Sequence, residues 1–587
     1  MACSKEEPPP TKRDPEPIDW QPPVVETIPS GVTYTDMTRR AGIDFVHYNA
    51  ASANKWLPET MGAGVAVIEF EPVDVRLLFI QGQLWEGQDR PPEGEPTMRL
   101  YKRIGEWQFK DVTKESGLDV PCHGMGCAVA DYDDDGDPDL YVTCLGPNLL
   151  FRNDGGKFVR VEGAPDGGKW TDEKGNEIWS WSTGAAWFDA NGDGRLDLIV
   201  LNYVHWTPET DVKTKFTDAS NTYTRPQLYD GDTVRLYLQK EDGSFEDATA
   251  RAGLRIVQRT GGKVEVAGEL GPIEGARDMG KSLGLVVDDF NRDGILDFMV
   301  ANDTVQNFMF CGRKDGSFNE CAQLAGVAFD DKGLARAGMG IDSAEVANDG
   351  RSVVAIGNFS GEPVFLFKVL RQLEDHVVME DEAVSARIGE ATLLPLTFGL
   401  AFLDADLDGW PDLVLANGHI EPTVANVQKE LQYEQAPQLF RNREGKRFFD
   451  VSLDAGAPFR KRIVGRGLAY ADLDDDGDLD LIITSNGGRP MVLRADLQEE
   501  HRSLRLRLRQ PERNRDAIGA VALVTANGVT QRRMVRTGGS YLSQSELTLT
   551  FGLAKAGRAE KVTVVWPDGT RQELGPLAAG SHVIVRK

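Results

Sequence analysis

The sequence is poor in cysteine, histidine and basic residues, and it has no long apolar run. It contains 6 cysteines and 7 histidines, and its 65 basic residues face 92 acidic ones, which gives a formal net charge of −27. A surface of that sign repels phosphate backbones, so we expect no nucleic-acid partner. No stretch reaches the roughly 18 consecutive apolar residues of a membrane-spanning helix, so none is expected.

The first 29 residues are predicted to form a flexible tether. Met1-Ala2-Cys3-Ser4 is followed by a polar, proline-rich stretch without a periodic apolar pattern. Ala-Cys-Ser resembles the end of a bacterial lipoprotein signal, in which Cys3 becomes lipidated; the alternative is a chance cysteine near a cytosolic start. The lipoprotein interpretation predicts an exported protein that is periplasmic, secreted or attached to a membrane through the lipid on Cys3.

One nonapeptide, Asp-x-(Asp/Asn)-x-Asp-Gly-x-x-Asp, occurs five times and predicts calcium loops. Calcium takes six to eight oxygens, and short acidic side chains at alternate positions of a tight turn supply them. The seventh residue varies, as expected if its backbone carbonyl is the ligand. The predicted ligands are Asp131, Asp133, Asp135, Asp137 and Asp139; Asp189, Asn191, Asp193, Arg195 and Asp197; Asp289, Asn291, Asp293, Ile295 and Asp297; Asp404, Asp406, Asp408, Trp410 and Asp412; and Asp472, Asp474, Asp476, Asp478 and Asp480.

An EF-hand begins in a similar way but needs a glutamate at position 12 and flanking helices. Here position 12 is apolar, as at Val142 and Val200, and it lies in short apolar runs typical of buried strands. The predicted unit is therefore strand, calcium loop, strand.

Two incomplete copies bring the series to seven. One contains Glu69 and Glu71 and lacks the glycine, and the other begins at Glu345 and has Val353 at the ninth position. We expect no calcium at either turn. The copies start at residues 69, 131, 189, 289, 345, 404 and 472, about 60 residues apart except for one interval of 100.

A second repeat, aromatic-x-(Asp/Glu)-x-(Thr/Ser/Ala)-x-x-(Ala/Ser)-Gly, marks the outer part of each unit. Each unit then offers about four strands, and seven such units predict a seven-bladed β-propeller over residues 30–498. The copy at Tyr34 precedes the first unit, so it is expected to add an outer strand to the last blade and close the ring.

The repeats resemble the FG-GAP family of integrin α-subunit propellers, also described as VCBS repeats, over roughly residues 30–495. Residues 499–587 resemble the ASPIC/UnbV domain, notably at 514–520, 538–544 and 565–569. A propeller followed by that domain is similar to the cartilage acidic protein family. The predicted fold class is therefore all-β, a seven-bladed propeller with a small C-terminal β-domain. In that domain residues 504–509 alternate leucine and arginine, which predicts a strand with its arginines facing solvent.

Four of the seven histidines are expected at the rim of the propeller opposite the calcium loops. His123 precedes an innermost strand, His205 and His419 follow second strands, and His47 lies in the loop entering the first unit. One interpretation is that they cap strand ends. The other is a copper or zinc site, since imidazole suits both metals.

Two cysteine pairs are candidates for disulfides. Cys311 and Cys321 flank a turn, and Cys127 and Cys144 flank the second unit's calcium loop. The alternative is that these side chains are small buried hydrophobes.

Two functions follow from these patterns. The first is a calcium-stabilised binding or adhesion module on a cell surface or in the medium, with an extracellular protein or glycan as partner. The second is a copper- or zinc-dependent enzyme that uses the histidine rim. The sequence has no P-loop, nucleophile elbow or dinucleotide fingerprint, which favours the first.

Overall fold

The computed structural model describes residues 27–587, apart from residues 71–73, 91–93, 173, 218–219 and 272. Cys3, most of the predicted tether and Glu71 lie outside the described residues. Within them, helices are short, and none has both the length and the apolar character needed to traverse a lipid bilayer.

Seven four-stranded antiparallel sheets follow one another along the chain. The first three comprise β2 (Val65–Phe70), β3 (Asp74–Phe79), β4 (Arg99–Gly105) and β5 (Gln108–Asp111); β6 (Gly124–Ala130), β7 (Asp139–Cys144), β8 (Leu149–Asp154) and β9 (Lys157–Arg160); and β12 (Ser182–Phe188), β13 (Asp197–Asn202), β16 (Arg235–Gln239) and β17 (Phe245–Asp247). The next three comprise β21 (Ser282–Asp288), β22 (Asp297–Asn302), β23 (Phe308–Gly312) and β24 (Phe318–Glu320); β25 (Ile341–Ala344), β26 (Val353–Ile356), β27 (Phe365–Gln372) and β28 (Val377–Asp381); and β29 (Thr397–Leu403), β30 (Asp412–Asn417), β31 (Gln438–Arg443) and β32 (Arg447–Asp450). The last comprises β33 (Gly465–Ala471), β34 (Asp480–Ser485), β35 (Met491–Leu497) and β1 (Val32–Asp36).

The first strands of the seven sheets form a closed ring. Contacts run from β2 to β6 and on through β12, β21, β25 and β29 to β33, which returns to β2. Second strands such as β13 are buried along their whole length, as their apolar runs predict. Radial repetition of four-stranded sheets is the architecture of a propeller, because it leaves only short sheet edges. We call these seven sheets the ring.

The ring is closed without a covalent bond. β1 pairs antiparallel with β35, from Val32 opposite Leu497 to Asp36 opposite Leu493, so the predicted outer strand at Tyr34 is confirmed. Tyr34 is buried, and its ring centroid lies 5.5 Å from that of Phe459. The start of the described chain thereby completes the sheet made by its last repeat.

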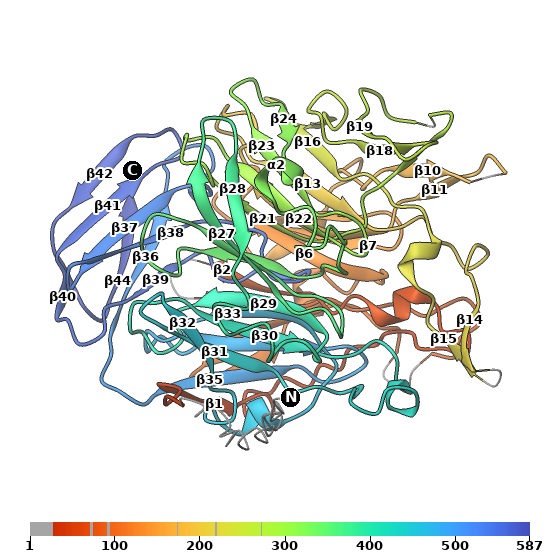
Figure 1. Cartoon of the computed structure of the whole chain (residues 1–587). Coiled ribbons are helices and arrows are strands. Elements are labelled where there is room, and N and C mark those ends of the chain that lie inside the picture. The colour runs from red at the N-terminus through yellow and green to blue at the C-terminus, as the bar shows by residue number, and fades with distance from the viewer. Residues whose placement is uncertain (1–26, 71–73, 91–93, 173, 218–219, 272) are drawn as a thin grey trace, which may run out of the picture.

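Shorter elements extend from the ring. They are β10 (Lys169–Thr171), β11 (Glu177–Trp179), β14 (Thr214–Thr217), β15 (Ser220–Thr222), β18 (Ile256–Arg259), β19 (Val264–Val266), β20 (Ala276–Asp278), α1 (Thr113–Ser116), α2 (Ala322–Ala325), η1 (Leu57–Thr60), η2 (Pro226–Leu228), η3 (Val424–Asn426) and η4 (Ala457–Arg460). Figure 1 shows the hairpins β10–β11 and β14–β15 at the right, on the side of the ring away from the C-terminal strands.

The C-terminal strands form a separate β-domain at the left of Figure 1. Its strands are β36 (Ser503–Arg509), β37 (Val521–Ala526), β38 (Val529–Met534), β39 (Leu549–Gly552), β40 (Arg558–Ala559), β41 (Lys561–Val565), β42 (Arg571–Leu574), β43 (Leu577–Ala578) and β44 (Ser581–Arg586). They pair as β39-β36-β44, β38-β37-β41-β42 and β40-β43.

Residues 536–548, which connect β38 to β39, enter the centre of the ring; we call them the axial segment. They contact the innermost strand of every sheet. Six contacts are hydrogen bonds to strand residues, and in the seventh the Tyr541 ring lies 4.9 Å from that of Phe398 in β29. The bonded pairs are Gln544 with Val65 and Val129, Thr537 with Trp187, Gly539 with Leu285, Ser540 with Ile341, and Ser545 with Tyr470.

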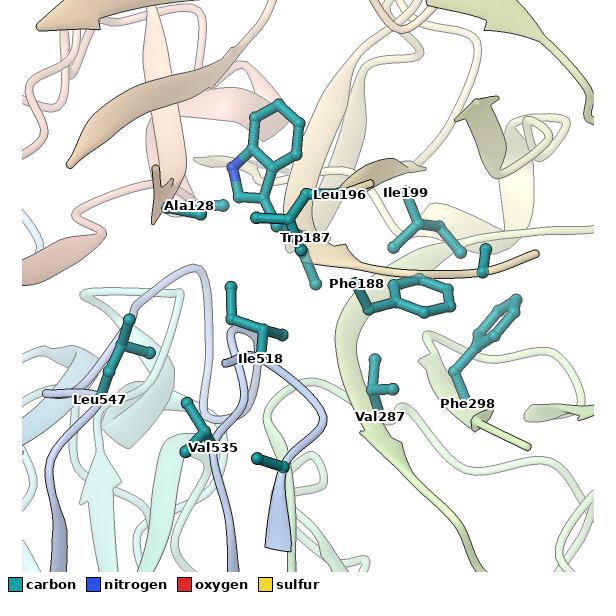
Figure 2. Packing of buried hydrophobic residues seen from close by; sticks show 14 of the residues in the cluster. Ala128, Trp187, Phe188, Leu196, Ile199, Val287, Phe298, Ile518, Val535 and Leu547 are labelled. Carbon is teal, nitrogen blue, oxygen red and sulfur yellow. The ribbon is translucent and has the colours of Figure 1, made fainter. Parts of the chain in front are cut away.

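The ring and the C-terminal domain share one hydrophobic cluster. Ile518, Val535 and Leu547 of the C-terminal domain belong to the same buried cluster as Trp187 and Val287 of the ring. Figure 2 shows these side chains gathered where the two parts meet. The domain is therefore packed on the ring rather than tethered to it.

Candidate metal sites

The five complete loops connect the first and second strands of their sheets and share one backbone geometry. In each, the N–H of the sixth-position glycine donates to a carboxylate oxygen of the first aspartate, for example Gly136 to Asp131 at 2.9 Å. The same bond is 2.8 Å in Asp189–Asp197, 3.0 Å in Asp289–Asp297, 2.9 Å in Asp404–Asp412 and 3.0 Å in Asp472–Asp480. Gly136 has a φ of 104°, a left-handed conformation that favours glycine.

The ninth aspartate has a structural role that the sequence pattern did not indicate. Both carboxylate oxygens of Asp139 accept backbone hydrogen bonds, from Tyr132 at 3.0 Å and from Asn153 in β8 at 2.8 Å. The other four ninth-position aspartates accept the equivalent pairs, from Ala190 and Gln239, Phe290 and Gly312, Ala405 and Asn442, and Leu473 and Ala495. The loop is thereby fastened to the third strand of its own sheet.

In each of three loops, three aspartates lie close enough together to bind one ion. Carboxylate oxygens of Asp131, Asp133 and Asp139 lie within 4.8 Å of one another, and so do those of Asp404, Asp406 and Asp412 and of Asp472, Asp474 and Asp480. Two oxygens bound to one calcium at about 2.4 Å can be at most about 4.8 Å apart, so the spacing fits calcium. The Asp189 and Asp289 loops have asparagine at the third position and keep the same glycine hydrogen bond.

Buried carboxylate oxygens without a hydrogen-bond partner test whether a cation fits. Among the described residues they include Oδ1 of Asp131, Asp404, Asp474 and Asp478. A buried anionic oxygen left unpaired is costly, and a coordinated cation removes that cost. Oxygen donors alone suit a hard cation such as calcium. Ligation by the seventh-position carbonyls stays a prediction.

Crowding raises the pKa values of these carboxyls. Burial, Asp516 and Asp134 raise the pKa of Asp131 to about 8. Burial raises the pKa of Asp139 to about 9, with Asp133 adding to it. Burial and Asp408 raise the pKa of Asp406 to about 7. Without a cation these groups therefore hold protons, and a divalent ion would compete with those protons for the same oxygens.

The two incomplete turns are filled by arginine. Glu69 accepts hydrogen bonds from the N–H of Leu547 at 2.6 Å and from Arg507 at 3.2 Å. Glu345 accepts one from Arg292 at 2.6 Å, and the N–H of Gly350 donates to its other oxygen at 3.2 Å. A guanidinium group thus supplies positive charge at each turn, and the absence of calcium from these turns stays a prediction.

The C-terminal domain covers the end of the ring that carries the loops. It hydrogen-bonds to backbone carbonyls of four complete loops and to the carboxylate of Asp404. The carbonyl contacts are Arg515 to Asp134, Arg513 to Asp193, His501 to Asp406, the N–H of Ala554 to Leu407, and Ser503 to Gly477. The backbone N–H of Gly552 donates to Oδ2 of Asp404 at 3.1 Å.

The prediction that the arginines of residues 504–509 face solvent is wrong. Arg505 and Arg507 are each 5% exposed. Arg505 pairs with Asp472 at 2.9 Å, and Arg507 pairs with Asp516 at 2.7 Å as well as with Glu69. The alternation was interpreted correctly as a two-sided strand, but its polar side faces the acidic end of the ring instead of water.

The four rim histidines belong to none of the groups of three or more potential metal ligands found among the described residues. In the part of the chain that the structure describes, the clusters with metal-ligand spacing consist of aspartates alone. The four histidines lie in loops next to different sheets, and His47 is close enough to His123 for that neighbour to lower its pKa further. A copper or zinc site at these histidines stays a prediction.

Each histidine has local partners, but Nε2 of His47 and Nε2 of His205 are buried without a hydrogen-bond partner. Nδ1 of His47 accepts a hydrogen bond from Gly487 N–H at 3.2 Å, and Nδ1 of His419 accepts one from Glu421 N–H at 3.0 Å. His123 packs on Trp85 at 4.6 Å and His205 stacks on Trp170 at 4.4 Å between ring centroids. Burial lowers the pKa of His47 to about 3 and that of His123 to about 4, so both are neutral.

Of the two predicted disulfides, only one is present. Cys311 and Cys321 are bonded, whereas Cys127 and Cys144 are free thiols. The register of the β6–β7 hairpin explains the second result, since Cys127 lies opposite Val142 and Cys144 lies opposite Gly124. The two cysteines flank the loop in sequence but are not partners across it.

Comparison with known proteins agrees with the two-part architecture. Residues 131–200 match an FG-GAP-like repeat, and residues 510–587 match ASPIC and UnbV. Cartilage acidic protein 1 of Homo sapiens is 26% identical over 485 residues, covering 76% of this chain and 69% of that protein. The Xenopus tropicalis protein is 27% identical over 486 residues, covering 76% and 70%.

Solved structures with similarity include the N-terminal domain of Nup159 and the Aleuria aurantia lectin. The first has a TM-score of 0.35 at 8% identity and covers 80% of this chain and 97% of that one. The second has a TM-score of 0.30 at 12% identity and covers 66% and 94%. The chain therefore contains an FG-GAP-like repeat and an ASPIC and UnbV domain, and it is distantly similar to cartilage acidic protein 1 over most of its length.

Proposed function

We propose that the chain is a seven-bladed β-propeller that binds calcium in its five complete loops and acts as an exported binding module for an extracellular protein or glycan. The observation that carries the calcium assignment is the set of buried, unpartnered carboxylate oxygens in loops whose aspartates have the spacing of one ion. Calcium in this position stabilises the fold, because it binds the folded loops and not the unfolded chain.

Two observations support the binding role. The C-terminal domain covers the end of the ring that carries the calcium loops, so the opposite end, with hairpins β10–β11 and β14–β15, is assigned to partner recognition (Figure 1). The Cys311–Cys321 disulfide is typical of oxidising compartments and supports export, whether to the periplasm, the cell surface or the medium. Attachment through a lipid on Cys3 belongs to the same proposal.

Metal analysis of the purified protein after dialysis against buffered calcium tests the assignment. We expect five calcium ions per chain and no stoichiometric copper or zinc. Asp135→Ala, at the fifth position of a complete loop, should lower the calcium content by one. Asp349→Ala, at the fifth position of the incomplete turn that begins at Glu345, is the matched control and should leave it unchanged. A calcium content near zero in the wild type would overturn the proposal.

A further inference from the structure

Two thiols meet at the end of the β6–β7 hairpin that is remote from its calcium loop. Gly124 lies directly opposite Cys144, and Leu145 N–H donates to the carbonyl of His123 at 2.9 Å. Cys122 precedes this pair, and its Sγ lies 3.5 Å from the position that a Cβ on Gly124 would occupy. The Cys122 side chain therefore folds back over the residue that faces Cys144.

The thiols of Cys122 and Cys144 lie near enough for Cys122 to shift the pKa of the Cys144 thiol, whose Sγ lies 3.8 Å from the carbonyl oxygen of Val142. Cys144 is buried, whereas Cys122 is partly exposed at the rim. Cys127 lies further along β6, opposite Val142, and burial alone raises the pKa of its thiol. Among the described free cysteines, Cys122 and Cys144 are therefore the pair that the hairpin brings together, since Cys122 Sγ lies beside Gly124 and Gly124 is the partner of Cys144.

We propose that Cys122 and Cys144 form a second disulfide, which nothing in the spacing of the cysteines had indicated. The oxidant is a disulfide-bearing protein or small molecule. The Cys122 thiolate attacks a sulfur of the oxidant and releases one thiol. The Cys144 thiolate then attacks Sγ of Cys122 and releases the second thiol, so the oxidant gains the two electrons and two protons that the cysteines lose.

The burial of Cys144 indicates when this reaction takes place. The neighbouring Cys122 and burial raise the pKa of the Cys144 thiol, so little thiolate is present once β7 is packed. Oxidation is therefore expected during folding. The bond closes a segment that contains the whole loop Asp131–Asp139, so the hairpin is held by its metal loop at one end and by the disulfide at the other.

Refolding in a glutathione redox buffer with calcium, followed by acid quenching and peptide mapping without reduction, tests this. We expect the Cys122 and Cys144 peptides to be cross-linked, with Cys127 alkylated. Finding Cys122 and Cys144 both alkylated, or Cys127 cross-linked to either, would overturn the inference. Because the readout is the covalent bond, the result is independent of whether the loops bind calcium.

Cysteine variants distinguish the loss of the Cys122–Cys144 disulfide from the loss of the folded structure. In Cys144→Ser, Cys122 should become reactive towards alkylating reagents in the folded protein, while the Cys311–Cys321 peptide stays cross-linked. Cys127→Ser is the matched control and should leave both disulfides intact. Reductant should lower the Tm of the wild type more than that of the double variant Cys122→Ser/Cys144→Ser. In the double variant, the decrease in Tm on reduction comes from the Cys311–Cys321 disulfide alone. Equal losses in both proteins would contradict the proposal.

Discussion

The loop at Asp131 and the turn at Glu69 occupy the same place in neighbouring sheets, yet they balance their negative charge in opposite ways. At the loop, the nearest guanidinium is that of Arg515, 4.0 Å from Asp131, and burial with neighbouring carboxylates raises the pKa of Asp131 to about 8. At the turn, burial opposes ionisation of Glu69, but Arg507, Thr548 and Leu547 outweigh it, so the pKa of Glu69 is lowered.

The difference shows how one repeat serves two purposes. The loop at Asp131 retains a surplus of negative charge that a cation from solution would balance, whereas in two other complete loops an arginine pairs with a loop aspartate, Arg505 with Asp472 and Arg441 with Asp408. The turn at Glu69 receives its cation from the C-terminal domain, so its charge is balanced within the chain. On the proposed function, the complete loops would make the ring responsive to calcium, while the turn at Glu69 fastens the C-terminal domain to the ring.

Removing calcium should have the largest effect, because it acts on all five complete loops at once and leaves both incomplete turns as they are. Each site that is saturated at 100 times its Kd contributes about 2.7 kcal/mol to the free energy of unfolding. We expect excess EGTA to lower the Tm markedly in differential scanning calorimetry. An unchanged melting curve would remove the distinction between the loops and the turns.

The pH dependence of the calcium-free protein should sharpen the comparison. The pKa values of Asp131, Asp139 and Asp197 are raised by burial to about 8, 9 and 8, above those of the unfolded chain. Their contribution to stability is therefore present at low pH and lost as the pH rises through about 8. The Tm in EGTA should fall from pH 5 to pH 8, while the Tm with calcium falls less.

The difference between the Tm with calcium and the Tm in EGTA should increase with pH, because protons and calcium compete for the same oxygens. A Tm in EGTA that rises from pH 5 to pH 8 would contradict the assignment of raised pKa values to the empty loops.

Arg507→Met should break the turn at Glu69, because it removes a guanidinium that pairs with Glu69 and with Asp516, neither of which is a predicted calcium ligand. The substitution leaves the buried Glu69 without its guanidinium partner, which typically costs about 3–5 kcal/mol. We expect a lower free energy of unfolding in urea titrations at saturating calcium, with the calcium content unchanged. Lys561→Met is the control, since its ion pair with Glu573 is exposed. Loss of a calcium ion from Arg507→Met would show that loop and turn are not independent.

Gly552→Ala should have a smaller effect and tests the contact between the domain and a complete loop. A methyl group at this position would overlap Asp404 and the backbone of Leu407. Overpacking of this kind costs about 1–3 kcal/mol. We expect faster proteolysis of the C-terminal domain at saturating calcium. Gly557→Ala, where the added Cβ meets no atom within 4 Å, is the control. Equal proteolysis of both variants would show that this contact does not stabilise the docking of the C-terminal domain on the ring.

Local patterns predicted most of the ring. The strand-loop-strand repeat, the closing strand at Tyr34 and the hairpin disulfide Cys311–Cys321 all follow from neighbours in sequence or from a regular period, and the structure has each of them. Three other features needed coordinates. The rim histidines have partners from distant parts of the chain, such as Gly487 for His47, Cys144 lies opposite Gly124 and not Cys127 because of strand register, and the axial segment enters the ring centre.

The sequence by itself determined which turns have the residues to hold an ion. The potential ligands of one loop lie within nine residues, and their spacing brings the oxygens that calcium requires into one short turn. Only the tertiary structure decided which groups balance the charges of the acidic residues in the incomplete turns. Arg507 and Glu69 are 438 residues apart and meet because the C-terminal domain packs on the ring. Alternation along a strand specifies two faces but not what each face meets, because that depends on contacts whose sequence separation is not periodic.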